Sequence, residues 1–316
     1  MLFGLASAWL LIAGHPCQAQ VATAATAAHA SPLPAETSAS PKDETTARPL
    51  PPIAVLMLDV ESHQREAEKI HKDYIYHSVE TAQEVDSHGA VKKTEVNEYD
   101  VFWIGGVPVR KLVRKDGREL TPDEARKESE RIDKEAAKAR ERREKEDAKG
   151  KETDPRGNDE VTVSRLLELG SFTNPRRVQL NGRDTIVVDY AGDPKAKTQN
   201  SFEGVIRDMT GTIWVDEQDH AIVKLQGRFV NNFRIGGGLV ASIQKDTNFS
   251  LQQTRVNGEV WLPARLEGHG EARVLLFFKF NGSLTVQDSD YRKFKTSSTI
   301  LPGASPADQP ATDVPK

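Results

Sequence analysis

The sequence lacks residues and patterns that several large classes of protein need. A single cysteine among 316 residues excludes an internal disulfide and a cysteine-based zinc site. The net charge is only −4, from 43 basic and 47 acidic side chains, and this small, evenly spread charge does not favour nucleic-acid binding. The composition also excludes a membrane protein with several spans.

Recognisable catalytic motifs are also missing. The sequence contains no HExxH, no P-loop and no GxGxxG motif, and no GxSxG motif beyond the N-terminal segment. The histidines are scattered, and Asp219 and His220 have the spacing of a tight turn. Asp288 and Asp290 share one side of an expected strand, where charges commonly protect a sheet edge. We therefore expect no catalytic residue, no bound metal and no cofactor.

The N-terminus has the layout of a secretory signal. Residues 2–13 form an apolar run of twelve, which is shorter than the roughly 20 helical residues that a bilayer requires. Gly14 and Pro16 follow, and then a small-x-small cleavage site that ends at Ala19. The sequence predicts a cleaved signal peptide at 1–19 and a periplasmic or secreted protein. Cleavage would remove Cys17, which suits an oxidising compartment.

Both ends of the mature chain are poor in large apolar side chains. Residues 20–52 are mainly Ala, Thr, Ser and Pro, and residues 301–316 are polar with four prolines. Such segments bury too little surface to offset the entropy lost on ordering. We expect a disordered tether at 20–52, one folded domain at 53–300 and a disordered tail at 301–316.

The folded part is expected to be rich in strands with few helices. Ile53 to about Lys72 has a partial apolar face that predicts a helix. Alternating patterns then predict consecutive antiparallel strands. Asn181-Gly182, Asn257-Gly258 and Asn281-Gly282 predict hairpin turns, because Asn-Gly tolerates positive φ at both positions. The expected fold is α+β, and the strand Ala272–Phe280 is apolar on both faces.

A charged insertion at 121–157 differs from the rest of the domain. Thr121, Pro122 and Glu124 form a helix-start signal, and residues 122–149 contain ten basic and ten acidic side chains. Its apolar positions are few but have helical spacing: Ala125, Ile132, Ala136 and Ala139. We interpret it as a long, solvated helix, and a partner-docking arm is the alternative.

Two hairpin motifs resemble those of the LolA-like lipoprotein-carrier superfamily. They are Gly211–Asp216 (GTIWVD), followed by Ile222–Leu225 (IVKL), and Val256–Arg265 (VNGEVWLPAR). The superfamily includes a periplasmic carrier, an outer-membrane acceptor and a sigma-factor regulatory sensor. The resemblance implies an exported protein with a large, curved antiparallel sheet, a half-open barrel. It also implies helices on the concave side and lipid chains lodged between sheet and helices.

Two functions of different class follow. The first is binding of a lipid, a lipoprotein or another apolar ligand in a cleft between the curved sheet and the helices, with peripheral membrane contact. The second is a non-catalytic envelope scaffold or regulator that binds a protein partner through the 122–149 helix. The candidate cleft residues are aromatic, because large apolar rings suit acyl chains: Trp103, Trp214, Phe229, Trp261, Phe278 and Phe280.

Overall fold

The computed structural model describes residues 48–104, 106–149, 167–199, 201–235, 241–274 and 278–294. The predicted signal peptide (1–19), most of the tether and the tail (301–316) lie outside these ranges and remain predictions. The end of the predicted insertion, 150–157, also lies outside them.

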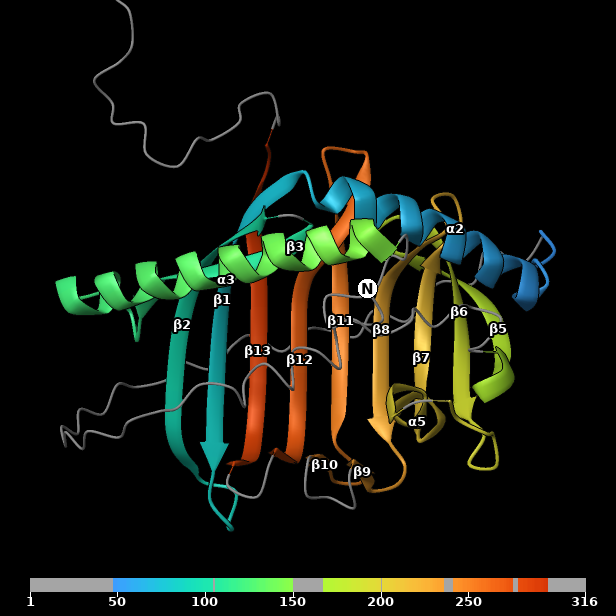
Figure 1. The fold of residues 1–316 in the computed structure, drawn as a ribbon. Helices are drawn as coiled ribbons and strands as arrows, with labels where there is room; N and C mark the ends of the chain where they lie inside the picture. Colours follow the sequence, from blue (N-terminus) through green and yellow to red (C-terminus); the bar gives the residue numbers. More distant parts are fainter. Residues whose placement is uncertain are drawn as a thin grey trace, which may run out of the picture.

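One antiparallel sheet of thirteen strands dominates the described chain (Figure 1). Its order is β4-β3-β2-β1-β13-β12-β11-β8-β7-β6-β5, and β9 and β10 pair beside β12. The two outermost strands, β4 and β5, do not pair within the described residues, so the sheet is not closed. This result confirms the predicted α+β class with a large open antiparallel sheet. The strands are β1 (Tyr74–Val85), β2 (Val91–Ile104), β3 (Val107–Lys115), β4 (Arg118–Glu119), β5 (Gly170–Leu180), β6 (Arg183–Gly192), β7 (Met209–Asp216), β8 (Ala221–Phe229), β9 (Phe233–Ile235), β10 (Ala241–Ile243), β11 (Asn248–Val256), β12 (Val260–Val274) and β13 (Phe278–Lys293).

Helix α2 (Ile53–His71) covers the apolar face of this sheet. Its buried residues Leu56 and Val60 pack against side chains from four strands, which form the main core. These side chains are Ile186, Val188, Ile213, Val215, Ile222, Leu225 and Leu251. In Figure 1, α2 runs across the upper ends of strands β11 to β6. The predicted helix at 53–72 is therefore confirmed.

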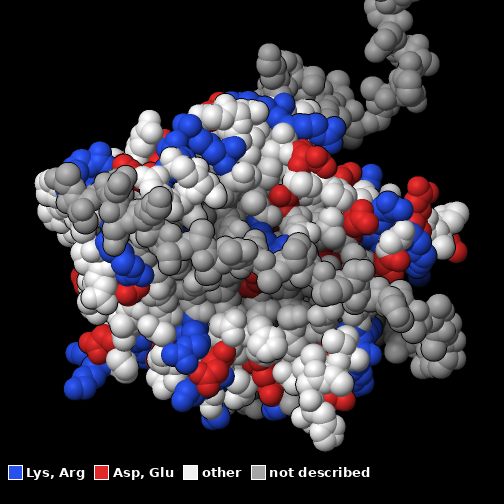
Figure 2. All heavy atoms as spheres, turned by 180° about the vertical axis from the view of Figure 1, so that it is seen from behind, with Lys and Arg blue, Asp and Glu red and all other residues white. Residues whose placement is uncertain are grey.

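Helix α5 (Ser201–Arg207) covers a second part of the same face. Its Ile206 packs with Tyr190 of β6. Ile186 and Val188, four and two residues before Tyr190 in the same strand, belong to the core cluster that includes Leu56 and Val60 of α2. Alternate residues of a strand share a face, so both helices lie on one side of the sheet. Figure 2 shows the molecule from behind, with acidic and basic side chains interspersed on the described surface.

Helix α3 (Pro122–Lys149) is the predicted charged helix, and one stripe of it is buried. Ala136 and Ala139 are buried and Ile132 is half-buried, as the helical spacing predicted, whereas Ala125 is exposed. Glu128 is buried in place of Ala125. It forms a hydrogen-bonded ion pair with Arg131, so the buried stripe of α3 includes a charged pair as well as apolar side chains.

The predicted turn at Asn281-Gly282 is wrong. The ladder pairs Phe280 with Ala272 and Leu284 with Gly268, so β13 continues through both residues. The backbone passes so close to β1 that a Cβ on Gly282 would lie 1.7 Å from the carbonyl oxygen of Gln83. Here the absence of a side chain allows the backbones of two strands to approach closely, which is one common reason for a glycine within a strand. The predicted strand Ala272–Phe280 is likewise wrong, because β12 ends at Val274 and β13 starts at Phe278.

No helix among the residues with described structure is long and apolar enough to cross a membrane.

Candidate functional site

A groove runs along one side of α2, between the helix and the ends of strands β8, β11 and β12. It consists of two hollows that share His220, one of about 410 Å³ near Arg48 and one of about 20 Å³ that reaches His71. The α2 residues that line the hollows recur every three or four positions, so they form one stripe of the helix. These are Leu56, Asp59, Val60, His63, Gln64, Ala67, Glu68 and His71.

The groove is apolar on its sheet side. Ala221 and Ile222 of β8 and Leu262 of β12 are buried there, beside the half-buried Trp261. Polar side chains of α2, such as His63 and Gln64, also line it. A concave apolar surface with a few polar groups is the usual chemistry of a site for small apolar molecules.

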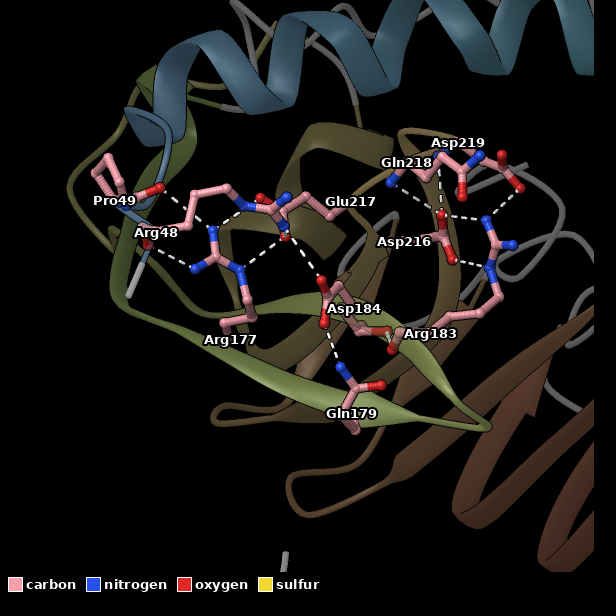
Figure 3. Close-up of polar contacts among 11 residues, drawn as sticks. Arg48, Pro49, Arg177, Gln179, Arg183, Asp184, Asp216, Glu217, Gln218 and Asp219 are labelled. Carbon is pink, nitrogen blue, oxygen red and sulfur yellow. Dashed lines mark hydrogen bonds and ion pairs between the residues drawn. The ribbon is translucent and has the colours of Figure 1, made fainter. Parts of the chain in front are cut away.

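An arginine–carboxylate network forms the mouth of the wide hollow (Figure 3). Arg177 donates to both carboxylate oxygens of Glu217, at 2.7 and 2.8 Å, and to the backbone carbonyls of Arg48 and Pro49. Arg48 donates to the same Glu217 at 2.6 Å. The hydrogen bond from Arg177 lowers the pKa of Glu217, so this carboxylate is ionised at neutral pH. The network fixes the chain that leads into α2.

The β7–β8 turn positions His220 where the two hollows meet. Asp216 is buried and accepts hydrogen bonds from Arg183 and from the backbone N–H groups of Gln218 and Asp219. Burial alone would raise the pKa of Asp216, but these hydrogen bonds outweigh it and the pKa lies below its ordinary value. His220 follows with a φ of 48°. The interpretation of Asp219 and His220 as turn residues is therefore confirmed.

Asp219 has a second contact that the sequence pattern did not indicate. It accepts a hydrogen bond from the indole N–H of Trp261 at 2.8 Å. This bond fixes the ring of Trp261 in the wall of the groove. The turn therefore shapes the site through both His220 and Trp261.

The narrow end of the groove terminates in a cluster of aromatic rings around His71. The ring of Trp103 meets His71 edge-on with centroids 5.0 Å apart, and Tyr76 stacks on it at 5.7 Å. Tyr291 stacks in turn on Tyr76 at 4.9 Å. Burial lowers the pKa of His71 to about 4, partly opposed by the charge of Glu68, so the imidazole is neutral at neutral pH.

The structure brings only some of the predicted cleft residues to this groove. Trp261 lines it, and Trp103 contacts His71 at its narrow end. Trp214 neighbours the buried Ile213 in β7 and points to the opposite face, where Lys224 lies 4.8 Å from its ring centre. Phe229 is buried in β8 and Phe280 is half-buried in β13. The side chain of Phe278 lies outside the description.

The carboxylate pair at 288 and 290 does not lie on a sheet edge, so that interpretation is wrong. The strand β13 pairs with β1 on one side and β12 on the other. Asp290 is exposed with a φ of 53°, whereas one carboxylate oxygen of Asp288 is buried without a hydrogen-bond partner among the described residues. Burial raises the pKa of Asp288 to about 6, although Ser78 and Arg110 lower it in part.

Sequence analysis missed His63, Ala67 and His71 as groove residues. Their spacing along the predicted helix indicates that they share one face, but it does not indicate that this face borders a groove. The cue that distinguishes them is the position of the β7–β8 turn beside α2, and this contact across more than 140 residues leaves no local pattern. Within the described ranges, no three His, Cys, Asp or Glu side chains form a group that could bind a metal.

Comparisons with known proteins yield solved structures only. No family model matches the chain, and no curated protein matches it. A domain assigned to outer membrane lipoprotein sorting, from Vibrio parahaemolyticus, aligns with 78% of this chain and 95% of its own, at 12% identity and a TM-score of 0.34. A LolA superfamily protein from Nitrosomonas europaea aligns with 75% and 93%, at 10% identity and a TM-score of 0.31.

A DUF1329 family protein from Desulfovibrio piger aligns with 76% of this chain and 95% of its own, at 10% identity and a TM-score of 0.30. The first two descriptions name the type of protein that the hairpin motifs resemble. We take the fold from the strand order and the site from the groove, and nothing about a ligand or partner follows from these alignments.

Proposed function

We propose that this chain is an exported, non-catalytic envelope protein that binds a long apolar ligand, such as the acyl chain of a lipid or lipoprotein, lengthwise in the α2 groove. The observation that carries the proposal is the pair of hollows that share His220 along one stripe of α2, the narrower one with an apolar wall on its sheet side. The hairpin motifs that resemble LolA-like carriers and the predicted signal peptide at 1–19 support the same function.

The stripe of α2 that lines the two hollows is long enough for an extended chain. Leu56 and His71 are 15 residues apart, which is about 22 Å of helix. Each CH₂ group that leaves water contributes about 0.8 kcal/mol, so a chain along this length would bind well. The narrow hollow of about 20 Å³ has room for a water molecule only. We therefore propose that α2 shifts from the sheet as the ligand enters from the wide hollow.

The test is to fill the groove at one small residue. Ala67→Trp places an indole against Leu262 and Trp261, and Ala137→Trp makes the same change on the exposed face of α3. Uptake of a fluorescent fatty acid should weaken by at least about tenfold in the first variant and stay unchanged in the second. Circular dichroism would verify that both variants fold.

Native mass spectrometry of protein purified from a periplasm without detergent gives an independent readout. Extra mass that extracts into organic solvent would identify the ligand class. A bare polypeptide mass together with no uptake of the fatty acid would rule the proposal out. Export itself is tested by N-terminal sequencing of the periplasmic protein, which should begin at Gln20.

A protein-binding role for α3 is the second candidate, and one observation favours it. Five of the six acidic residues in the first half of α3 pair with arginines, as Asp123 and Glu130 do with Arg126. Lys127, Lys134 and Lys138 are exposed and form no ion pair with any described residue. At about 100° per residue these three lysines form one row on the helix.

Such a row would attract an acidic protein surface. A variant with glutamine at all three positions should then lose a partner that co-purifies with the wild-type protein from a periplasmic extract, and high salt should remove the same partner. A partner that survives both treatments would contradict this role. Substitution is preferable to deletion of the helix, because α3 also covers the edge of β3.

A further inference from the structure

The narrow end of the groove contains a polar atom that the fold does not use. The Nε2 atom of His71 is buried and has no hydrogen-bond partner among the described residues. His71 is also among the residues that line the hollow of about 20 Å³, at the end of the α2 stripe farthest from the wide hollow, which we call the closed end of the groove. Buried polar groups in proteins nearly always have partners, and an exception at the end of a groove points to a ligand or an ordered water.

Neighbouring donors do not supply the missing partner. The indole N–H of Trp103 donates to the backbone carbonyl of Tyr74 at 3.1 Å. The hydroxyl of Tyr291 donates to the carbonyl of Pro263 at 2.6 Å. The aromatic rings that surround His71 therefore contribute apolar walls, and its Nε2 remains available to a group that enters along the groove.

We infer that the ligand carries a neutral polar end group, a hydroxyl or a carbonyl, which lies at the closed end of the groove and hydrogen-bonds to Nε2 of His71. This inference rests on the proposed function and specifies its ligand class and orientation. A neutral imidazole has one N–H and one lone pair, so it can either donate to a carbonyl or accept from a hydroxyl. His71 is then a specificity-determining residue.

An ionised head group does not fit this end. A carboxylate or phosphate would lose its water among the rings of Trp103 and Tyr76, and a neutral imidazole cannot compensate for the lost hydration. The charged residue near this end is Glu68, whose negative charge would repel an anion, whereas Arg48 lies at the opposite end, in the wide hollow. A charged amphiphile would therefore bind in the reverse direction and leave His71 without a partner.

The experiment uses the mature protein with a neutral fluorescent polyene in the groove, displaced by three ligands of similar length: dodecanol, tridecane and dodecanoate. The ratio of alcohol to alkane affinity isolates the hydrogen bond from the burial of the chain. We expect dodecanol to bind about tenfold more tightly than tridecane at neutral pH, and dodecanoate to bind more weakly than dodecanol.

Three variants separate the possible outcomes. His71→Phe should bring the affinity ratio close to one. His71→Gln, which keeps a donor and an acceptor, should restore part of the ratio, and His63→Phe, two helical turns earlier on α2, should not change it. A ratio that is the same in wild type and His71→Phe would show that Nε2 binds only a water, and would overturn this inference while leaving the proposed function intact. Absence of polyene binding to the folded wild-type protein would overturn both.

Discussion

Glu128 of α3 accepts a hydrogen bond from the backbone N–H of Leu112 in β3, with 2.7 Å between nitrogen and oxygen. Arg131, one helical turn further on, donates to the backbone carbonyl of Arg110 in the same strand. The short strand β4 pairs only with Arg114 and Lys115, so the rest of β3 is a sheet edge. The charged helix therefore satisfies and covers backbone groups that would otherwise attract another strand.

Removal of this contact should detach α3. In Glu128→Ala, the N–H of Leu112 loses its partner and Arg131 keeps only Glu135 as an ion-pair partner, which should cost about 1–3 kcal/mol of stability. Urea unfolding measures the loss, and size-exclusion chromatography should show more self-association. Glu130→Ala is the matched control, because Glu130 pairs only at the surface with Arg126. Equal stability of the two variants would contradict the edge-covering role.

Two leucines of α2 should differ in their contribution to stability. Leu56 is buried against the sheet, whereas Leu58 is 51% exposed on the other side of the helix. Leu56→Ala should destabilise the protein by about 2–5 kcal/mol, since it leaves a cavity in the core. Leu58→Ala should change the free energy of unfolding by less than about 0.5 kcal/mol. Similar losses would mean that α2 does not pack as described.

The buried carboxyl of Asp288 should make stability depend on pH. Its pKa is raised to about 6 by burial, whereas an unfolded aspartate titrates near 3.9. Between these values the folded protein binds one proton more than the unfolded chain, so stability falls as pH rises from about 4 to 6. Thermal unfolding across this window measures the effect.

Asp288→Asn should remove that dependence. The variant should be more stable than the wild type by roughly 3 kcal/mol at neutral pH and equal to it below about pH 4. Asp290→Asn, at an exposed position two residues further along β13, should follow the wild-type curve. A variant that is less stable than the wild type at neutral pH would show that ionised Asp288 is stabilised by its surroundings.

Gly282 should tolerate no side chain. A Cβ at this position would overlap the carbonyl oxygen of Gln83, at 1.7 Å, in the strand that pairs with it. Gly282→Ala should therefore cost more than about 3 kcal/mol or prevent folding. Gly89, in the β1–β2 turn, has open space around its Cβ position, so Gly89→Ala should cost only about 1 kcal/mol, from its φ of 82°. Circular dichroism and urea unfolding compare the two.

Local patterns predicted most elements of this fold, because they depend on residues close in sequence. Asn181-Gly182 and Asn257-Gly258 form the expected hairpin turns with positive φ at both positions. The same dipeptide at 281–282 failed, because its glycine serves the approach of β1, a strand about 200 residues away. The chemistry of a dipeptide does not indicate which of these uses applies.

The candidate site was less predictable than the fold. Large aromatic residues were the visible signal, and Trp261 and Trp103 do lie at the groove. Trp214, with the same side-chain chemistry, lies on the other face of the sheet, because strand alternation relative to the core decides its direction. The inference about the ligand rests on His71, whose Nε2 atom has no hydrogen-bond partner among the described residues. The rings around His71 come from three separate strands, so no local sequence pattern indicates this environment.

The pairing of β1 with β13 determines the order in which this sheet can assemble. Tyr74 lies opposite Lys293, so strands from the two ends of the described chain are neighbours in the interior of the sheet. During synthesis, β1 to β4 and β5 to β12 can form as two separate arrays of paired strands, but no strand pairs one array with the other until β13 emerges. A ribosome-bound chain that ends before Phe278 would consist of two unjoined half-sheets with open edges. The last strand in sequence is therefore the one that unites the two halves of the sheet, and a chain that lacks β13 should not complete this fold.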